Sequence, residues 1–156
     1  MNLILWRHAE AEDYAASDLA RPLTPRGQQQ AQAVAQWLQA RLDPDAVVLA
    51  SPALRTRQTA QALSEHYRVV PLLAPDASVA EVLSAAGWAD GSVANTVVIV
   101  GHQPTLGHVA AHLLAGERRS WPLQKAGLWW LQHHMAGTDQ GASTALLHAA
   151  LTPDQV

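Results

Sequence analysis

Short apolar runs punctuate the chain and stop abruptly at polar or small residues. The clearest runs are Asn2–Trp6, Ala46–Ala50 and Thr96–Val100, which are rich in Leu, Ile and Val. Runs of this length and composition are typical of parallel strands that are buried on both faces of a sheet. We therefore predict a strand for each run, and a further strand for Arg68–Leu73, just before Pro75.

Helical periodicity fills the segments between these runs. The strongest pattern is Arg26–Leu42, with Thr24 as its expected N-cap and Pro25 at the first helical position. Further helices are predicted from Ala53 to about His66, over Ser78–Ala86 ending near Gly87, and over Pro104–Leu114 ending at Gly116. Leu128–His134 and Ala145–Leu151 are predicted to be a terminal pair of strands. This alternation predicts an α/β fold with a mainly parallel central sheet flanked by helices.

Length and composition predict one globular domain. A chain of 156 residues suits a single core, so we expect one domain over residues 1–156. The composition is 49% hydrophobic and only 15% charged, which is typical of a compact protein and unlike a disordered one. No internal repeat or interdomain linker is evident, so we look for a single functional site.

Charge and residue usage exclude several classes of function. The net charge is -3 and the basic residues are scattered, which argues against a nucleic-acid partner. The chain has no cysteine, so thiolate catalysis, disulfides and cysteine-ligated metals are excluded. Met1–Trp6 is too short for a signal peptide, and no apolar run approaches the roughly 20 residues of a transmembrane helix. We expect a cytoplasmic monomer without a membrane partner.

Histidines and arginines collect where the predicted strands end. The first strand runs into Arg7 and His8, the second leads to Arg55, and the strand over Thr96–Val100 leads to His102. The carboxyl ends of parallel strands share one edge of a sheet, where ligands commonly bind. Histidine is a competent nucleophile and arginine binds phosphoryl oxygens through paired hydrogen bonds, so the set favours phosphoryl transfer. Any one of these residues alone fits equally well as an ordinary polar side chain where a strand meets water.

Four segments resemble the histidine phosphatase superfamily, whose Arg-His-Gly motif histidine is phosphorylated during turnover. They are LILWRHAEAE at Leu3–Glu12, RPLTPRGQQQA at Arg21–Ala31, SPALRTRQTA at Ser51–Ala60 and VIVGHQPTLG at Val98–Gly107. The resemblance implies that His8 is the nucleophile, that Arg7 and Arg55 hold the phosphoryl oxygens, and that His102 is a second pocket histidine. It also implies a phosphoglycerate mutase-like fold of three layers.

Details of the segments are similar to the SixA-type phosphohistidine phosphatases, which act on phosphorylated proteins. Asp18 and Arg21 stand before Pro-Leu-Thr as in that type, and the chain has no room for the large cap insertion of bigger relatives. Arg21 and Ser51 are therefore candidate substrate-binding residues. The departure is Ala9, where the family usually has glycine, and we expect it to tighten the turn after His8.

The implied mechanism needs no metal or other cofactor, because cationic side chains neutralise the phosphoryl charge. An alcohol leaving group would need a general acid, for which Asp76 and Glu81 are the candidates, and Glu81 also fits a solvated helix face. A phosphohistidine bond is labile and depends less on a general acid.

The leading hypothesis is a phosphohistidine phosphatase acting on a signalling or phosphotransfer protein. The alternatives are a small-molecule phosphomonoesterase and a non-catalytic module that binds phosphoproteins.

Other histidines and tryptophans have plainer explanations. His108 and His112 have the spacing of a helical metal pair, but no third ligand or glutamate base accompanies them, so a structural role is favoured. His133 and His134 are adjacent on a predicted strand and point to opposite faces, so they too are expected to be structural. Most of the tryptophans fit the core. Trp88 and Trp121 fall in predicted loops, where an exposed indole could help to dock a partner.

Overall fold

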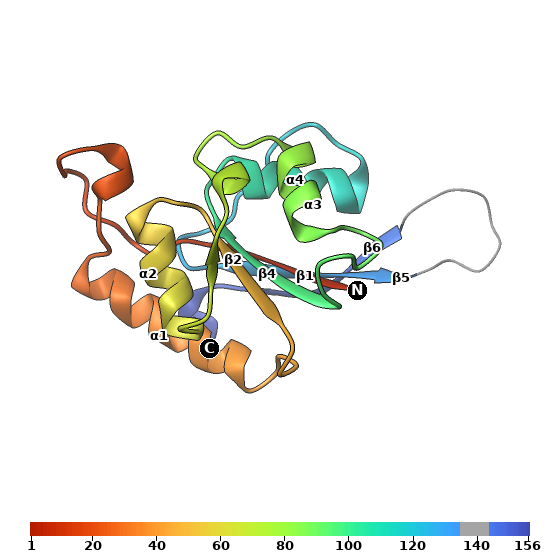
Figure 1. The fold of residues 1–156 in the computed structure, drawn as a ribbon, viewed down its shortest axis with the longest axis horizontal. Helices are drawn as coiled ribbons and strands as arrows, with labels where there is room; N and C mark the ends of the chain where they lie inside the picture. The colour runs from red at the N-terminus through yellow and green to blue at the C-terminus, as the bar shows by residue number, and fades with distance from the viewer. Residues whose placement is uncertain (135–143) are drawn as a thin grey trace.

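The computed structural model describes residues 1–134 and 144–156, and over these residues it shows one sheet. The strands are β1 (Asn2–Arg7), β2 (Val47–Ala50), β3 (Arg68–Val69), β4 (Thr96–Gly101), β5 (Leu128–His134) and β6 (Thr144–Leu151). Their order across the sheet is β3-β2-β4-β1-β5-β6 (Figure 1). The first four strands along the chain are mutually parallel, whereas β5 is antiparallel to β1 and to β6. The prediction of a mainly parallel sheet is confirmed.

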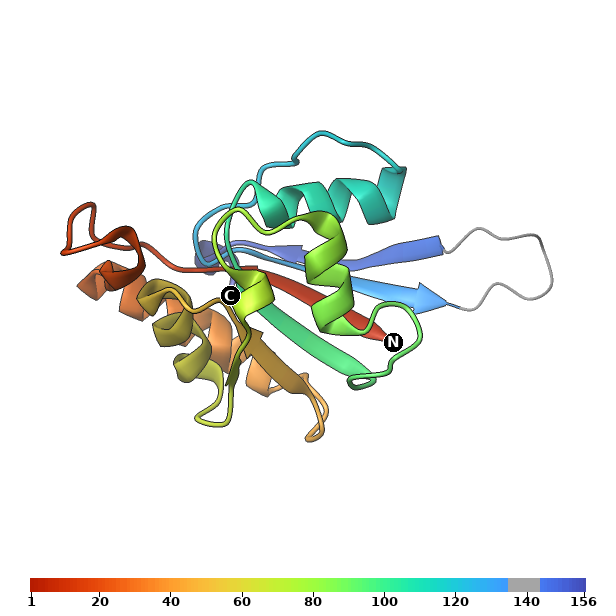
Figure 2. The ribbon, with the colours of Figure 1, turned by 45° about the horizontal axis from the view of Figure 1, so that its top comes forward.

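Helices cover both faces of this sheet. The α-helices within the described residues are α1 (Pro25–Gln39), α2 (Leu54–Leu63), α3 (Val79–Ala86) and α4 (Thr105–Ala115). The pair α1 and α2 packs on one face, and the pair α3 and α4 packs on the other (Figures 1 and 2). The result is the three-layer α/β arrangement that the sequence predicts. Within the described residues, no helix is long and apolar enough to cross a bilayer.

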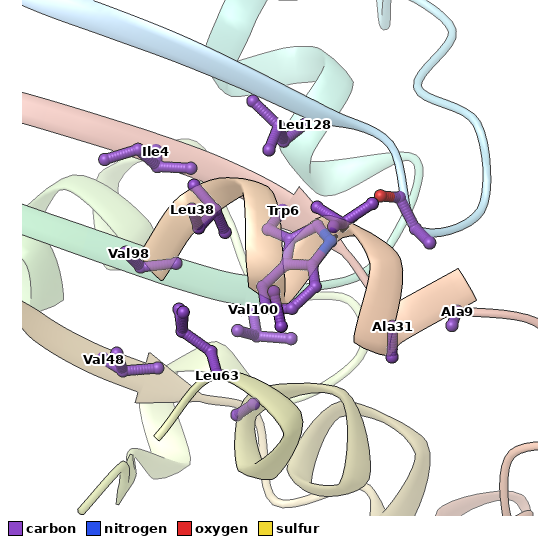
Figure 3. Close-up of a cluster of buried hydrophobic side chains, with 14 of the residues drawn as sticks. Ile4, Trp6, Ala9, Ala31, Leu38, Val48, Leu63, Val98, Val100 and Leu128 are labelled. Atoms are coloured by element: carbon purple, nitrogen blue, oxygen red, sulfur yellow. Dashed lines mark hydrogen bonds between the residues drawn. The ribbon is translucent and has the colours of Figure 1, made fainter. Parts of the chain in front are cut away.

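Each face of the sheet has its own hydrophobic core. On the side of α1 and α2, Ile4, Trp6, Val98 and Val100 project from β1 and β4 onto the helices (Figure 3). Trp6 is fully buried, and its indole Nε1 donates a hydrogen bond of 2.9 Å to the carbonyl oxygen of Ala126. This bond ties the end of β1 to the loop before β5. It helps to fix the strand end that carries the candidate nucleophile.

Helix α1 begins as predicted and ends earlier. The Thr24 hydroxyl accepts a hydrogen bond from the backbone N–H of Gly27, and Pro25 occupies the first turn. The predicted end at Leu42 is wrong, because the helix stops at Gln39. Leu42 still packs against the core from the turn that follows, which explains why the apolar periodicity continues past the helix. Similarly, α2 ends at Leu63, before the expected His66, because Ser64 is already extended.

The prediction of a strand over Arg68–Leu73 is wrong beyond its first residues. Only Arg68–Val69 pairs with β2, and Pro71–Leu73 forms a 3-10 turn. Pro71 has no N–H to donate to a sheet ladder, so the strand cannot continue through it. Leu73 is nevertheless 3% exposed, because the turn itself delivers its side chain to the core.

Helices α3 and α4 match the predictions closely at their ends. Ser78 and Glu81 form a reciprocal capping box at the start of α3, and Gly87 closes it in the left-handed conformation at a φ of 62°. Gly116 closes α4 in the same way, at a φ of 65°. Both helices follow loops that border the candidate site.

The tryptophans proposed as exposed docking residues are instead partly buried. Trp88 packs edge-on against His133 with ring centroids 5.5 Å apart, and Trp121 packs against Trp129 at 5.5 Å. Both belong to the margin of the core beneath α3 and α4. The expectation that these two indoles are exposed is therefore wrong, because the loops that carry them fold back onto the sheet.

Candidate active site

The ends of β1, β2 and β4 deliver the candidate residues to one edge of the sheet. His8 directly follows β1, Ser51 follows β2, and His102 follows β4. The backbone N–H of His8 donates to the Gly101 carbonyl oxygen at 3.1 Å, which continues the pairing of β1 with β4. The imidazole rings of His8 and His102 consequently lie 5.4 Å apart, centroid to centroid. Parallel strand pairing therefore brings together two residues that are far apart in sequence.

A backbone contact fixes the proton on the His8 ring. The Nδ1 atom of His8 lies 2.8 Å from the carbonyl oxygen of Ala9. A carbonyl oxygen can only accept, so Nδ1 carries the hydrogen in the neutral ring. The lone pair is then on Nε2, which is the arrangement that a nucleophilic histidine requires.

Burial holds both histidines in the neutral form. His8 is 8% exposed, and burial together with the charges of Arg55 and Arg7 lowers its pKa from 6.5 to about 4, against the opposing effect of the Ala9 hydrogen bond. Burial, followed by the charges of His8 and Arg55, lowers the pKa of His102 to about 3. Both rings are therefore uncharged at neutral pH, so His8 has a lone pair available.

His102 is held from behind by Ser51. The Oγ atom of Ser51 lies 2.7 Å from Nε2 of His102, and it also accepts a hydrogen bond from the Ala53 N–H at 3.2 Å. Ser51 is fully buried and does not line the cavity, so it reaches a substrate only through His102. We predicted that Ser51 binds the substrate. In the structure its hydroxyl contacts His102 and supports that ring.

Arg55 connects the histidine pair to the loop before α1. Its Nη1 donates to the Asp18 carbonyl oxygen at 2.8 Å, and its Nη2 lies 3.2 Å from the Asp18 carboxylate and 3.4 Å from Nδ1 of His102. Asp18 also pairs with Arg21 at 3.0 Å. Burial alone would raise the pKa of Asp18, but the hydrogen bonds and charges of Arg21 and Arg55 outweigh it and lower that pKa. One carboxylate therefore positions two arginines at the cavity.

The guanidinium groups of Arg7 and Arg55 have N–H donors that lack a hydrogen-bond partner among the described residues. Arg7 donates through Nη1 to the Leu123 carbonyl oxygen at 2.9 Å. The Nε atoms of both arginines are buried and have no hydrogen-bond partner within the described residues. Buried polar groups are normally satisfied, so a pair of under-bonded guanidinium groups beside one cavity favours an anionic ligand there.

The cavity at this edge has a volume of about 220 Å³. It brings together five of the six residues expected to be catalytic or substrate-binding, namely Arg7, His8, Arg21, Arg55 and His102. The remaining lining residues are Ala11, Asp13, Pro75, Asp76, Gln103 and Lys125. Of the two candidate acids, Asp76 borders the cavity, whereas Glu81 is engaged in the capping box of α3. Asp13, Gln103 and Lys125 were not anticipated from the sequence.

Ala9 is accommodated without backbone strain. Among the described residues, positive φ angles at non-glycine positions occur only at Asp76 and Ala126, so Ala9 does not need the conformation that favours glycine. Its N–H donates to the Thr59 hydroxyl at 3.1 Å, and that hydroxyl donates to the Arg55 carbonyl oxygen at 2.8 Å. The loop after His8 is thus tied to the helix that carries Arg55.

No group of three or more metal-ligating side chains gathers anywhere in the described part of the chain. His108 and His112 lie on α4, where Nδ1 of His108 is 2.9 Å from the Arg118 carbonyl oxygen. That contact, together with the lack of a third neighbouring ligand in the described residues, agrees with a structural role for the pair. The positive charges around His8 come from arginine and lysine side chains.

The buried histidines should make the protein sensitive to mild acid. Between pH 6.5 and 4 the unfolded chain binds a proton at His8 that the folded protein excludes, so stability falls as pH falls. We expect the wild type to lose about 1–2 kcal/mol more unfolding free energy than His8→Asn between pH 7 and 5. Urea unfolding of both proteins at the two pH values measures this difference. Equal losses in the two proteins would contradict the buried neutral state of His8.

Comparisons with known proteins agree on the family. The family model described as "Histidine phosphatase superfamily (branch 1)" matches residues 3–82. Phosphohistidine phosphatase SixA of Escherichia coli K12 is 31% identical over 75% of this chain and 76% of its own. The SixA homolog of Haemophilus influenzae is 28% identical over 96% of each chain. A solved structure of the protein histidine phosphatase SixA complexed with tungstate superposes with a TM-score of 0.83 at 25% identity, covering 99% of both chains.

That coverage confirms the small phosphoglycerate mutase-like fold without a large cap insertion. The matched segment includes the strand ends and helices that carry Arg7, His8 and Arg55. The chain therefore belongs to branch 1 of the histidine phosphatase superfamily.

Proposed function

We propose that this protein is a phosphatase that works through a transient phosphohistidine on His8, and that its substrate is a phosphohistidine in a signalling or phosphotransfer protein. The observation that carries the proposal is the state of His8. Its ring is neutral, its Nδ1 is hydrogen-bonded to Ala9, and its Nε2 is left with a lone pair beside Arg7 and Arg55. The family and the named relatives support the same chemistry.

In the first step, Nε2 of His8 attacks phosphorus and forms a new P–N bond. The bond between phosphorus and the substrate nitrogen breaks, and the leaving imidazole keeps the electron pair. A proton on the other nitrogen of that imidazole makes it leave as a neutral ring. Arg7 and Arg55 are positioned to neutralise the charge that spreads over the phosphoryl oxygens.

In the second step, water attacks the phosphorus and the bond to His8 breaks. His8 regains its neutral form with the hydrogen still on Nδ1, and the water protons end on dihydrogen phosphate. In both steps arginine side chains neutralise the phosphoryl oxygens, so the proposed mechanism uses no metal ion. Asp18 contributes by holding Arg55 and Arg21 in place.

Two observations favour phosphohistidine over other phosphates. A phosphoramidate bond breaks without a strong external acid, whereas an alkyl ester needs a proton donor. The relatives from Escherichia coli and Haemophilus influenzae carry names that describe phosphohistidine phosphatases. A cytoplasmic setting, in which such phosphotransfer proteins would be met, stays a prediction, as does the monomeric state.

A small-molecule phosphomonoesterase is the second candidate, and the position of Asp76 is the observation that favours it. Its side chain borders the same cavity as His8, from the loop before α3, where it could supply a proton to an alkoxide leaving group. The two candidates share the nucleophile and differ in their dependence on this carboxylate.

The test compares free phosphohistidine with an alkyl phosphate such as glycerophosphate, in the presence of a chelator. We expect kcat/KM to be at least about 100-fold higher for phosphohistidine, because its P–N bond breaks without a strong acid, whereas the ester depends on a proton from Asp76. The same assays on Asp76→Asn should leave phosphohistidine turnover nearly unchanged. Asp45→Asn, an exposed carboxylate outside the cavity, is the control. Faster ester hydrolysis that collapses only in Asp76→Asn would establish the phosphomonoesterase instead.

A further inference from the structure

A wider groove opens beside the catalytic cavity. Its volume is about 770 Å³, against about 220 Å³ for the cavity itself. Arg7 and Lys125 line both, so the two spaces are adjoining. The other groove residues are Glu10, Arg26, Gln29, Gln30, Ala33, Gln124, Pro153 and Asp154. The cavity around His8 therefore continues into a larger space that a phosphate alone cannot fill.

One wall of the groove is a face of α1. Arg26, Gln29, Gln30 and Ala33 are spaced so that they project from the same side of this helix. The facing residues, Gln124 and Lys125, come from the loop before β5. The groove ends at the 3-10 turn Pro153–Gln155, which lies beside α1 near the C-terminus (Figure 1). The helix, the loop and the C-terminal turn thus form the walls of one groove with a polar lining.

Only some of the charged side chains in the groove have hydrogen-bond partners within the protein. Glu10 accepts a hydrogen bond from the Thr24 hydroxyl at 3.0 Å, and Asp154 accepts one from the Thr152 hydroxyl. The side chains of Arg26 and Lys125, in contrast, have no hydrogen bond or ion pair to any described residue. Both carboxylates keep their charge, but each already accepts a hydrogen bond within the protein, whereas the two cationic side chains remain available to an incoming group. Together with Arg7, the lining carries three cations against two carboxylates. An occupant that carries acidic side chains complements this lining.

We propose that this groove, called here the α1 groove, binds the protein segment next to the phosphohistidine, and that Arg26 and Lys125 select a segment with acidic side chains. The inference rests on the proposed function and goes further, because it names a feature of the substrate. The phosphohistidine side chain enters the catalytic cavity between Arg7 and Lys125. The flanking main chain runs along α1, where the exposed amide of Gln29 supplies hydrogen bonds to peptide groups.

The test uses two synthetic peptides that differ only in whether glutamates or lysines flank one phosphohistidine. We expect the wild type to show a kcat/KM about three- to tenfold higher for the glutamate peptide, since each exposed ion pair adds a modest attraction. The preference should appear mainly in KM and should shrink at high salt, where exposed charges are screened. Free phosphohistidine serves as a substrate that does not reach the groove.

Two variants test whether the residues of the α1 groove cause this preference for the glutamate peptide. Arg26→Glu should abolish or reverse it, and a glutamate in the first turn of α1 is compatible with folding. Ala33→Trp should fill the groove and raise KM for both peptides. Neither residue borders the catalytic cavity, so turnover of free phosphohistidine should stay within about twofold of wild type in both variants. Arg57→Glu is the matched control, because Arg57 is exposed on α2 and lines neither space.

The outcomes separate this inference from the proposed function. Equal kcat/KM for the two peptides, or a preference that Arg57→Glu removes as readily as Arg26→Glu, would overturn the α1 groove as the selecting surface. No phosphate release from either peptide or from free phosphohistidine would overturn the proposed function, and the inference with it. A preference that Arg26→Glu alone reverses, with free phosphohistidine unaffected, would support both.

Discussion

Replacing His8 with asparagine is expected to reduce phosphatase turnover by at least about 10⁴-fold, the scale of loss seen when an enzyme nucleophile is removed. Asparagine retains a polar side chain of similar reach and offers no lone pair that can displace a leaving group from phosphorus. The surrounding arginines remain, so phosphate binding should survive while turnover does not. Phosphate release and inorganic phosphate binding, measured on the same preparation, check both halves of this expectation.

His112→Asn is the control for the His8 variant, because His112 is exposed on α4 and lies outside the catalytic cavity. It should turn over like the wild type. Turnover by His8→Asn within about tenfold of wild type would mean that another group attacks phosphorus. Loss of both turnover and phosphate binding in a folded His8→Asn protein would point instead to a binding role for the imidazole.

Replacing Arg55 with lysine is expected to lower kcat/KM by about 10²–10³-fold, even though the charge is retained. The guanidinium holds three positions at once, through the Asp18 carbonyl oxygen, the Asp18 carboxylate and Nδ1 of His102. A lysine ammonium is a point charge and cannot span these directions while also facing a phosphoryl oxygen. Steady-state kinetics on phosphohistidine should show the loss mainly in kcat.

Arg57→Lys is the control for this second variant, since Arg57 is on the same helix with its side chain exposed. It should leave both kinetic constants near wild type. A kcat/KM for Arg55→Lys that stays within about threefold of wild type would show that the simultaneous contacts of the Arg55 guanidinium are not needed for turnover. A thermal unfolding scan establishes whether any loss reflects the site or the fold, because Arg55 is 4% exposed.

Much of the fold could be predicted because local signals and tertiary burial agree. The β-branched run that forms β4 is buried along its whole length, and Thr24 and Pro25 begin α1 as the capping rules require. Two of the errors arise where an apolar side chain packs against the core from a turn. Leu42 and Leu73 both reach the core from turns, and periodicity cannot distinguish that from continued helix or strand.

The candidate site was predictable in part because strand ends mark it. His8 and His102 each follow a buried strand, and parallel pairing brings them together. Asp13 and Lys125 were missed because nothing in the local sequence says that their loops fold over the same cavity. The support that Ser51 gives to His102 was missed for a similar reason, since it depends on two strand ends being neighbours in the sheet.

The measurement that tests the central claim most directly is the location of phosphate on the enzyme during turnover. The protein is mixed with phosphohistidine substrate, quenched rapidly in alkali, in which a phosphohistidine survives, and digested for mass spectrometry. We predict phosphate on the peptide that carries His8, appearing in the wild type and absent from His8→Asn. Turnover without any phosphorylated enzyme, or with phosphate on His102 instead, would contradict His8 as the nucleophile.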